Sequence, residues 1–155
     1  GQARPRECRV KKAYARDFSE LDAIVADTAA FFATHAIDPN LRPKVDLAIE
    51  ELFVNLVTYN TEARGLVTIE LCAVERGIEV TLTDRGVDRF DPTRAGDVDV
   101  ESLLAERAPG GLGLYLVSKM VDTIHYEYRD RTSKITFTNR SASSEEGEDV
   151  RNRLQ

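Results

Sequence analysis

Residues 48–55 of the 155-residue chain read Ala-Ile-Glu-Glu-Leu-Phe-Val-Asn and carry the clearest structural pattern in the sequence. Its apolar residues recur three and four positions apart, the spacing of one face of an α-helix. The same period continues on both sides and predicts a helix from about Arg42 to Asn60. Glu51 and Asn55 are four residues apart, about 40° from each other around the helix axis, at the border of the apolar face. Glu50 falls on the opposite flank, where we expect it to contact solvent.

Outside this helix, the period of the apolar residues alternates between that of helices and that of strands. We expect a strand at Cys8–Ala15, a helix at Ser19–His35, strands at Leu66–Val74 and Gly77–Thr83, a helix at Leu112–Ile124, and a closing hairpin of Ile124–Asp130 with Lys134–Asn139. Residues 84–110 form a long polar stretch, which in a compact domain indicates a lid or binding loop. Helices and strands grouped in this way predict an α+β fold, a two-layer sandwich with helices on one face of a mixed, mostly antiparallel sheet.

The composition excludes several classes of protein. A chain with 42% hydrophobic and 31% charged residues is not of a disordered or low-complexity type. Its net charge of −6 disfavours direct binding to nucleic acid. No apolar run reaches the roughly 18 residues of a membrane-spanning helix, so no membrane association is expected. Cys8 and Cys72 fit neither a disulfide framework nor a metal site, which favours a cytoplasmic location. We expect one domain at 7–139 and a disordered tail at 140–155.

Two groups of polar residues are candidates for a binding or catalytic site. The amide oxygen of Asn55 is a neutral, hard ligand for Mg²⁺, and the Glu51 carboxylate can deprotonate a hydroxyl or a water. More often, such a pair of polar residues lies on the flank of a helix and has no function. Asp84-Arg85-Gly86 follow a buried strand, where a carboxylate can accept a hydrogen bond from an exocyclic amine. An ordinary turn explains the same three residues.

A third group, Gly110-Gly111-Leu112-Gly113-Leu114, opens the last predicted helix. Glycines at a helix N-terminus leave backbone N–H groups accessible at the positive end of the helix dipole, which suits phosphate groups. A flexible hinge is the alternative. The stretch is neither a P-loop nor a Rossmann fingerprint, because it has no Gly-Lys-Ser/Thr and no third glycine at the required spacing.

In this order, the three groups resemble the nucleotide site of the GHKL ATPase superfamily: Glu-x-x-x-Asn on a helix, Asp-x-Gly after a strand, and Gly-x-Gly before a helix. Within this superfamily, the chain looks most like the compact anti-sigma-factor serine/threonine kinases. The resemblance covers residues 7–139. It rests on residues 48–55, on Asp84-Arg85-Gly86 followed by Phe90-Asp91-Pro92, and on residues 110–117.

The resemblance implies a role for each matching residue. Asn55 would ligate a Mg²⁺ that bridges the phosphates of ATP, and Glu51 would be the general base. Asp84 would bind the adenine amino group, with Gly86 leaving room beside it. The remaining nucleotide contacts that it implies are Gly111, Leu112, Gly113 and Leu114 at the end of the lid, and Thr136 at the adenine.

The resemblance implies that this protein is an ATP- and Mg²⁺-dependent protein serine/threonine kinase that acts as an anti-sigma factor. Such a protein phosphorylates an anti-anti-sigma partner of the STAS type, sequesters a sigma factor and forms a homodimer. Two positions differ from the common pattern: Asp88 stands where a second glycine is frequent, and Tyr59 where a basic residue is frequent. They motivate an alternative, a GHKL-type switch module that binds a partner with weak or no catalysis.

Overall fold

The computed structural model describes residues 8–59, 63–86 and 111–142 of the chain. Its elements in chain order are β1 (Arg9–Tyr14), η2 (Phe18–Glu20), α1 (Leu21–Thr34), η3 (Pro39–Leu41), α2 (Arg42–Tyr59), β2 (Val67–Val74), β3 (Gly77–Arg85), α4 (Gly111–Met120), β4 (Thr123–Arg129) and β5 (Thr132–Arg140). Residues 87–110 of the expected loop and 143–155 of the expected tail lie outside the described residues. Within the described ranges, no helix is long and apolar enough to cross a membrane.

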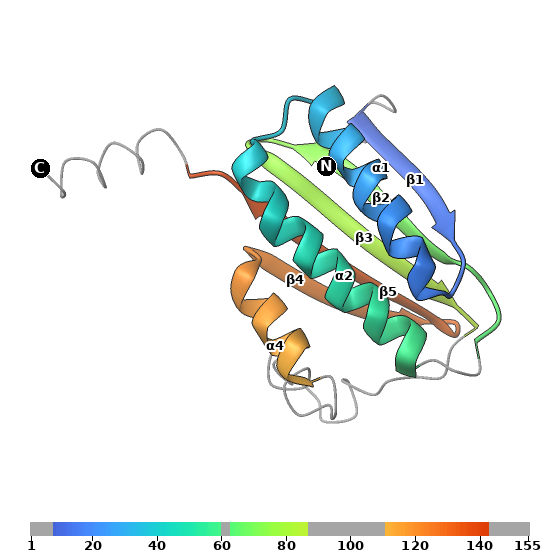
Figure 1. Cartoon of the computed structure of the whole chain (residues 1–155). Helices are drawn as coiled ribbons and strands as arrows, with labels where there is room; N and C mark the ends of the chain where they lie inside the picture. Colours follow the sequence, from blue (N-terminus) through green and yellow to red (C-terminus); the bar gives the residue numbers. More distant parts are fainter. Residues whose placement is uncertain (1–7, 60–62, 87–110, 143–155) are drawn as a thin grey trace, which may run out of the picture.

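The five strands form one sheet in the order β1-β2-β3-β5-β4. The three α-helices cover one face of it, which confirms the predicted two-layer α+β sandwich (Figure 1). The expected sheet was mixed and mostly antiparallel, whereas every strand pairing among the described residues is antiparallel. The β2–β3 and β4–β5 hairpins need antiparallel neighbours, and the β1–β2 and β3–β5 pairs, whose connections contain helices, are antiparallel as well.

The core lies between α1, α2 and the inner face of the sheet. The α2 residues that pack there recur with the helical period that the sequence shows: Val45, Ala48, Ile49, Leu52, Phe53 and Leu56. Along β3, the residues on the inner face are Ile78, Val80 and Leu82, each 0% exposed, while Glu79, Thr81 and Thr83 between them are half-buried. Burying a side chain of this size stabilises the fold by about 1.5–3 kcal/mol. Helix α2 lies between α1 and α4 and is central to the helical layer (Figure 1).

Helix α4 ends at Met120, so the prediction that it continues to Ile124 is wrong. At that point, residues at the end of β5 form hydrogen bonds with the backbone of residues 120 and 122. The Asn139 side chain donates to the Met120 carbonyl at 3.2 Å, and the Asp122 N–H donates to the Thr138 carbonyl at 2.9 Å. These bonds join residues far apart in the sequence, so they override the local apolar period that suggested a longer helix.

The C-terminal strand also extends further than expected. Arg140 is the last residue of β5, and the backbone N–H of Ser141 donates to the Arg76 carbonyl at 2.7 Å. The Arg76 side chain donates in return to the Ser141 carbonyl at 2.8 Å. Residues 140 and 141, which the sequence predicts to be part of a disordered tail, therefore belong to the folded end of the sheet.

The β1 edge and the outer face of the sheet are polar. At one edge, five of the six residues of β1 are exposed, and they include Arg9, Lys11 and Lys12. On the outer face, away from the helices, side chains surround a hollow of about 340 Å³. The residues lining it are Lys11, Thr68, Glu70, Glu79, Thr81, Thr83, Arg85, Thr132, Lys134 and Thr136.

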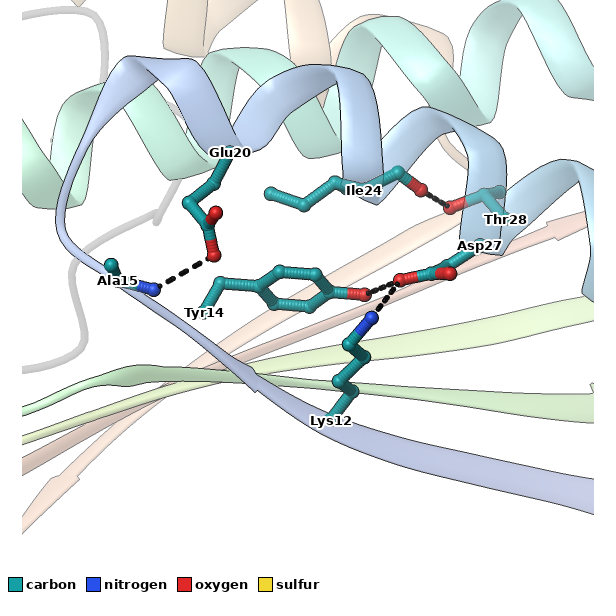
Figure 2. A network of polar contacts seen from close by, with 7 residues as sticks. All are labelled: Lys12, Tyr14, Ala15, Glu20, Ile24, Asp27 and Thr28. Carbon is teal, nitrogen blue, oxygen red and sulfur yellow. Dashed lines mark hydrogen bonds and ion pairs between the residues drawn. The ribbon is translucent and has the colours of Figure 1, made fainter.

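A small polar network fastens β1 to α1 (Figure 2). Asp27 of α1 accepts hydrogen bonds from the Lys12 ammonium at 2.8 Å and from the Tyr14 hydroxyl at 2.7 Å. The bond from Lys12, and then that from Tyr14, hold the pKa of Asp27 below its usual value of 3.8. At the start of the helix, Glu20 accepts from the Ala15 N–H at 3.1 Å, so both ends of the short connection are held.

We predict that Gly77→Ala destabilises the protein by about 1–3 kcal/mol, because overpacking forces the backbone to shift. An added Cβ would lie 2.0 Å from the Asn139 carbonyl oxygen and 2.8 Å from the Cα of Arg140. Urea denaturation measures the effect. Gly65→Ala is the matched control, because the nearest atom to its Cβ, the Arg85 carbonyl oxygen, is 3.9 Å away. Equal stabilities of the two variants would contradict the tight approach of β3 to β5.

We predict that Asp27→Asn costs about 0.5–1 kcal/mol near neutral pH, as expected for a partly exposed ion pair. The lowered pKa of Asp27 means that its contribution is present above the unfolded value of 3.8 and is lost as the pH falls through the lower value of the folded state. The difference between wild type and variant should therefore shrink in acid. Urea denaturation at a series of pH values tests this, with Asp22→Asn, exposed on the same helix, as control. A difference that does not change with pH would exclude the ionised Asp27 as its source.

Candidate functional site

Helix α2 places its two candidate residues at the border of the core, as its period predicts. Asn55 is buried at 8% exposure, Glu51 one turn earlier is half-buried, and Glu50 is exposed. The three side chains therefore have distinct surroundings although two of them are adjacent carboxylates. Only Glu51 and Asn55 lie on the inner flank of the helix.

A hydrogen bond holds the Asn55 side chain in one orientation and leaves its amide oxygen without a partner among the described residues. Its amide nitrogen donates to the Glu51 carbonyl at 2.9 Å. Its Oδ1 is buried and has no hydrogen-bond partner among the described residues. A buried acceptor without a partner costs about 1–3 kcal/mol, so such an atom needs an explanation, and a bound ion is one of those known in proteins. A neutral amide oxygen that is already desolvated and oriented fits a hard cation such as Mg²⁺.

Asp84 continues the inner row of β3 and is 0% exposed. Its Oδ1 accepts from the Arg16 guanidinium at 2.5 Å, and the other Arg16 nitrogen donates to the Leu56 carbonyl of α2 at 2.8 Å. The end of β3 and the C-terminal turn of α2 are thus joined by one side chain. A buried carboxylate that is charge-paired accepts hydrogen bonds and donates none, which suits recognition of an amine.

Gly86 follows one residue beyond β3 and has a φ of +70°. This left-handed conformation is strained for residues with a Cβ, which explains a glycine at this position. No atom of the described structure lies within 4 Å of the place that a Cβ would take. Among the described residues, the space beside the Gly86 backbone is therefore open.

Helix α4 begins at Gly111, so Gly111, Leu112, Gly113 and Leu114 form its first turn. The backbone N–H groups of a first turn have no acceptor within the helix and lie at the positive end of its dipole. Val117, which is 0% exposed, anchors the helix to the core beside α2. In Figure 1, the start of α4, the C-terminal end of α2 and the end of β3 lie at the same end of the molecule. The structure thus brings the three predicted groups to one region.

Thr136 is not part of this region. Strand β5 pairs with β3 so that Thr136 lies opposite Thr81, and the two hydroxyls are 3.2 Å apart at the hollow on the outer face. Side chains two residues apart along a strand share a face, and adjacent ones do not. The residue opposite Asp84 is Ser133, which is 4% exposed. The expected contact of Thr136 with adenine is therefore corrected: Ser133 is the β5 hydroxyl on the side of Asp84.

Sequence reasoning missed two residues of this region, Ser133 and Arg16. Ser133 depends on the register between β3 and β5, which the alternation within each strand does not define. Arg16 lies in the connection between β1 and η2, where no periodic pattern marks it, and it reaches Asp84 across 68 positions of sequence. Only the folded arrangement identifies either residue.

Comparison with known proteins identifies the family of this domain. Residues 15–139 match the family described as the histidine kinase-like ATPase domain. The chain belongs to this family of ATPase domains, which implies that it binds ATP and confirms the resemblance to GHKL ATPases.

Individual relatives narrow the comparison. The serine/threonine-protein kinase BtrW of Bordetella bronchiseptica is 27% identical over 104 residues, which cover 66% of this chain and 72% of BtrW. A chain in the crystal structure of the SiaB-SiaC complex from Pseudomonas aeruginosa superposes with a TM-score of 0.61 and 15% identity, over 86% of this chain and 90% of that chain. At such low identity, this superposition shows the fold. It confirms the two-layer architecture.

Proposed function

We propose that this protein is an ATP- and Mg²⁺-dependent protein serine/threonine kinase of the anti-sigma-factor type. The observation that carries the proposal is the buried, unpartnered Oδ1 of Asn55 on the same inner helix flank as the Glu51 carboxylate. A neutral metal ligand and a candidate base on one helix turn are what phosphoryl transfer to a hydroxyl requires. The relationship to a chain named as a serine/threonine-protein kinase supports this choice over ATP binding alone.

Each residue then has a distinct task. Asn55 would offer its oriented Oδ1 to Mg²⁺, which when bound neutralises phosphate charge. Glu51 would accept the proton of the attacking serine or threonine hydroxyl as the γ-phosphate leaves ADP. The N–H groups in the first turn of α4, at Gly111 and Gly113, would hold the phosphates. At the other end, Asp84 would accept from the adenine amino group, beside the open backbone of Gly86.

The phosphoacceptor would be a serine or threonine of an anti-anti-sigma protein of the STAS type. In this proposal the kinase also sequesters a sigma factor, forms a homodimer and acts in the cytoplasm, where transcription takes place. The support is the relationship to a named serine/threonine kinase, together with a structural neighbour that was solved in a complex of two proteins.

Two positions favour a second candidate, a switch module that binds nucleotide and partner with little or no transfer. Tyr59, the last residue of α2, provides no positive charge near the phosphates. Asp88 adds a negative charge to the sequence shortly after Gly86. Less neutralisation of phosphate charge would slow transfer more than binding. A complex with the STAS-type partner that gains no phosphate over hours with Mg-ATP would favour this candidate.

We predict that Asn55→Ala lowers the affinity for Mg-ATP by about tenfold or more, because a direct metal ligand is lost. Affinity for ATP in EDTA should change little, which makes the same protein its own control. Calorimetry with and without Mg²⁺ measures both. Without nucleotide, the free energy of unfolding should stay within about 1 kcal/mol of wild type, because removal of the unpartnered oxygen offsets the lost hydrogen bond. Equal losses of affinity with and without Mg²⁺ would contradict the ligand role.

We predict that Glu51→Gln slows phosphate transfer by about 10²–10⁴-fold, because a general base is removed while the shape of the side chain is kept. Affinity for Mg-ATP should stay within a factor of about three. The measurement is transfer of radiolabelled γ-phosphate to a purified STAS-type protein. Glu50→Gln, the exposed neighbour on the same turn, is the matched control and should transfer at the wild-type rate. Equal rates in the two variants would exclude Glu51 as the base.

A further inference from the structure

The outer face of the sheet carries the hollow of about 340 Å³ described above, and the proposed mechanism does not use it. Helices α1, α2 and α4 all lie on the opposite face (Figure 1). Threonines of β2, β3 and β5 line the hollow, and the hydroxyls of Thr81 and Thr136 are 3.2 Å apart there. A hydroxyl can donate to a carboxylate as well as accept. The hollow is therefore a polar surface that no helix or strand of the described structure covers.

Positive side chains at the hollow outnumber negative ones. Lys11, Arg85 and Lys134 are exposed, and none of the three forms an ion pair with another described residue. Both carboxylates that line the hollow, Glu70 and Glu79, already have partners. The whole chain has a net charge of −6, so this group of unpaired cations differs from the protein's average surface. It favours a negatively charged occupant.

The chain itself has a group of negative charges shortly after the last strand. Strand β5 ends at Arg140, and the next residue, Ser141, is fastened to the turn between β2 and β3. Its N–H donates to the Arg76 carbonyl at 2.7 Å, and its carbonyl accepts from the Arg76 side chain at 2.8 Å. The sequence then has an acidic segment, residues 145–149, whose four carboxylates are Glu145, Glu146, Glu148 and Asp149. This segment follows a point that the fold fixes at the end of the sheet.

The acidic segment is long enough to reach the hollow. Lys134 precedes Arg140 by six positions on β5, which is about 20 Å along a strand that rises about 3.3 Å per residue. Glu145 and Asp149 follow Ser141 by four and eight positions, so extended chain would carry them at most about 14 and 29 Å from it. The inner face is closed by the core, so the outer face is the one open to them.

We propose that the acidic segment docks in the hollow on the outer face of the sheet, with its carboxylates between Lys11, Arg85 and Lys134. Each exposed ion pair stabilises the contact little, but four carboxylates facing three cations act together. Threonine hydroxyls on the floor of the hollow donate to the carboxylates. A chain whose own segment occupies this face shields it from other acidic proteins. The proposal is independent of the proposed nucleotide site, which lies on the helical side of the sheet.

Zero-length carbodiimide coupling on the full chain tests the proposal, because it joins a lysine amine to a carboxylate only where the two are in contact. Mass spectrometry of the digested protein locates each new amide bond. Lys11 and Lys134 report on the hollow, and Lys44, exposed on α2 in the helical layer, is the matched control. Coupling in an equal mixture of unlabelled and isotope-labelled protein separates amides within one chain from amides between two chains.

We expect amides from the acidic segment to Lys134 and Lys11 within one chain, and none to Lys44. Coupling in 1 M salt should abolish them, because the Debye length falls to about 3 Å. Arg85→Gln should lower their yield by about two- to fivefold, the effect of one exposed ion pair. Arg64→Gln, at an exposed arginine that does not line the hollow, should leave the yield unchanged.

Three results would overturn the proposal. Amides that join only labelled to unlabelled chains would show that a second copy occupies the hollow. Coupling to Lys44 as strong as coupling to Lys134 would show that the acidic segment has no preferred surface. Absence of any amide between the acidic segment and Lys11 or Lys134 would leave the outer face to an acidic partner protein. None of these results bears on ATP binding, so the proposed function would stand or fall separately.

Discussion

The packing of α2 against the inner face of the sheet supports every other part of the molecule. Two rows of residues meet there: Leu52 and its neighbours on α2, and Ile78, Val80 and Leu82 on β3. Each row is apolar along most of its length: the strand row ends in Asp84, and the helix row contains Asn55 near its C-terminal end, just before Leu56. The two ends are close, because Arg16 contacts both Asp84 and the residue after Asn55. The candidate site is thus the end of the core, where the same two rows continue with polar side chains.

This arrangement explains how the fold tolerates buried polar groups that lower its stability. Asn55 and Asp84 are fixed on regular elements whose positions are determined by apolar contacts, so their orientation does not depend on a ligand. The unpartnered Oδ1 of Asn55 is a local loss of stability that the surrounding core offsets. Sites that hold unfavourable polar groups in this way are common where a ligand later satisfies them. The burial of Asp84 needs Arg16 for the same reason, since an unpaired carboxylate there would oppose folding.

Local periodicity predicted most of the helices and strands and the part of the candidate site that lies on α2. The α2 period placed Asn55 and Glu51 on the inner flank and Glu50 outside, because those positions follow from helix geometry alone. The same approach extended α4 too far, since Asn139 ends it through a contact between distant segments. The contact of Thr136 with adenine came from the resemblance and not from periodicity, and Thr136 lies on the outer face, opposite Thr81. Arg16 carries no periodic signal, so only the folded chain shows that a loop residue compensates the buried Asp84.

The positive charge along β1 has a consequence for how copies of this protein meet. An edge strand presents unpaired N–H and C=O groups, which can join the sheet of another molecule and begin aggregation. Arg9, Lys11 and Lys12 are exposed along this edge. If two such strands approached each other, their like charges would come together and repel. These residues therefore disfavour pairing between two β1 edges, although Asp27 and Glu70 partly offset the charges of Lys12 and Arg9.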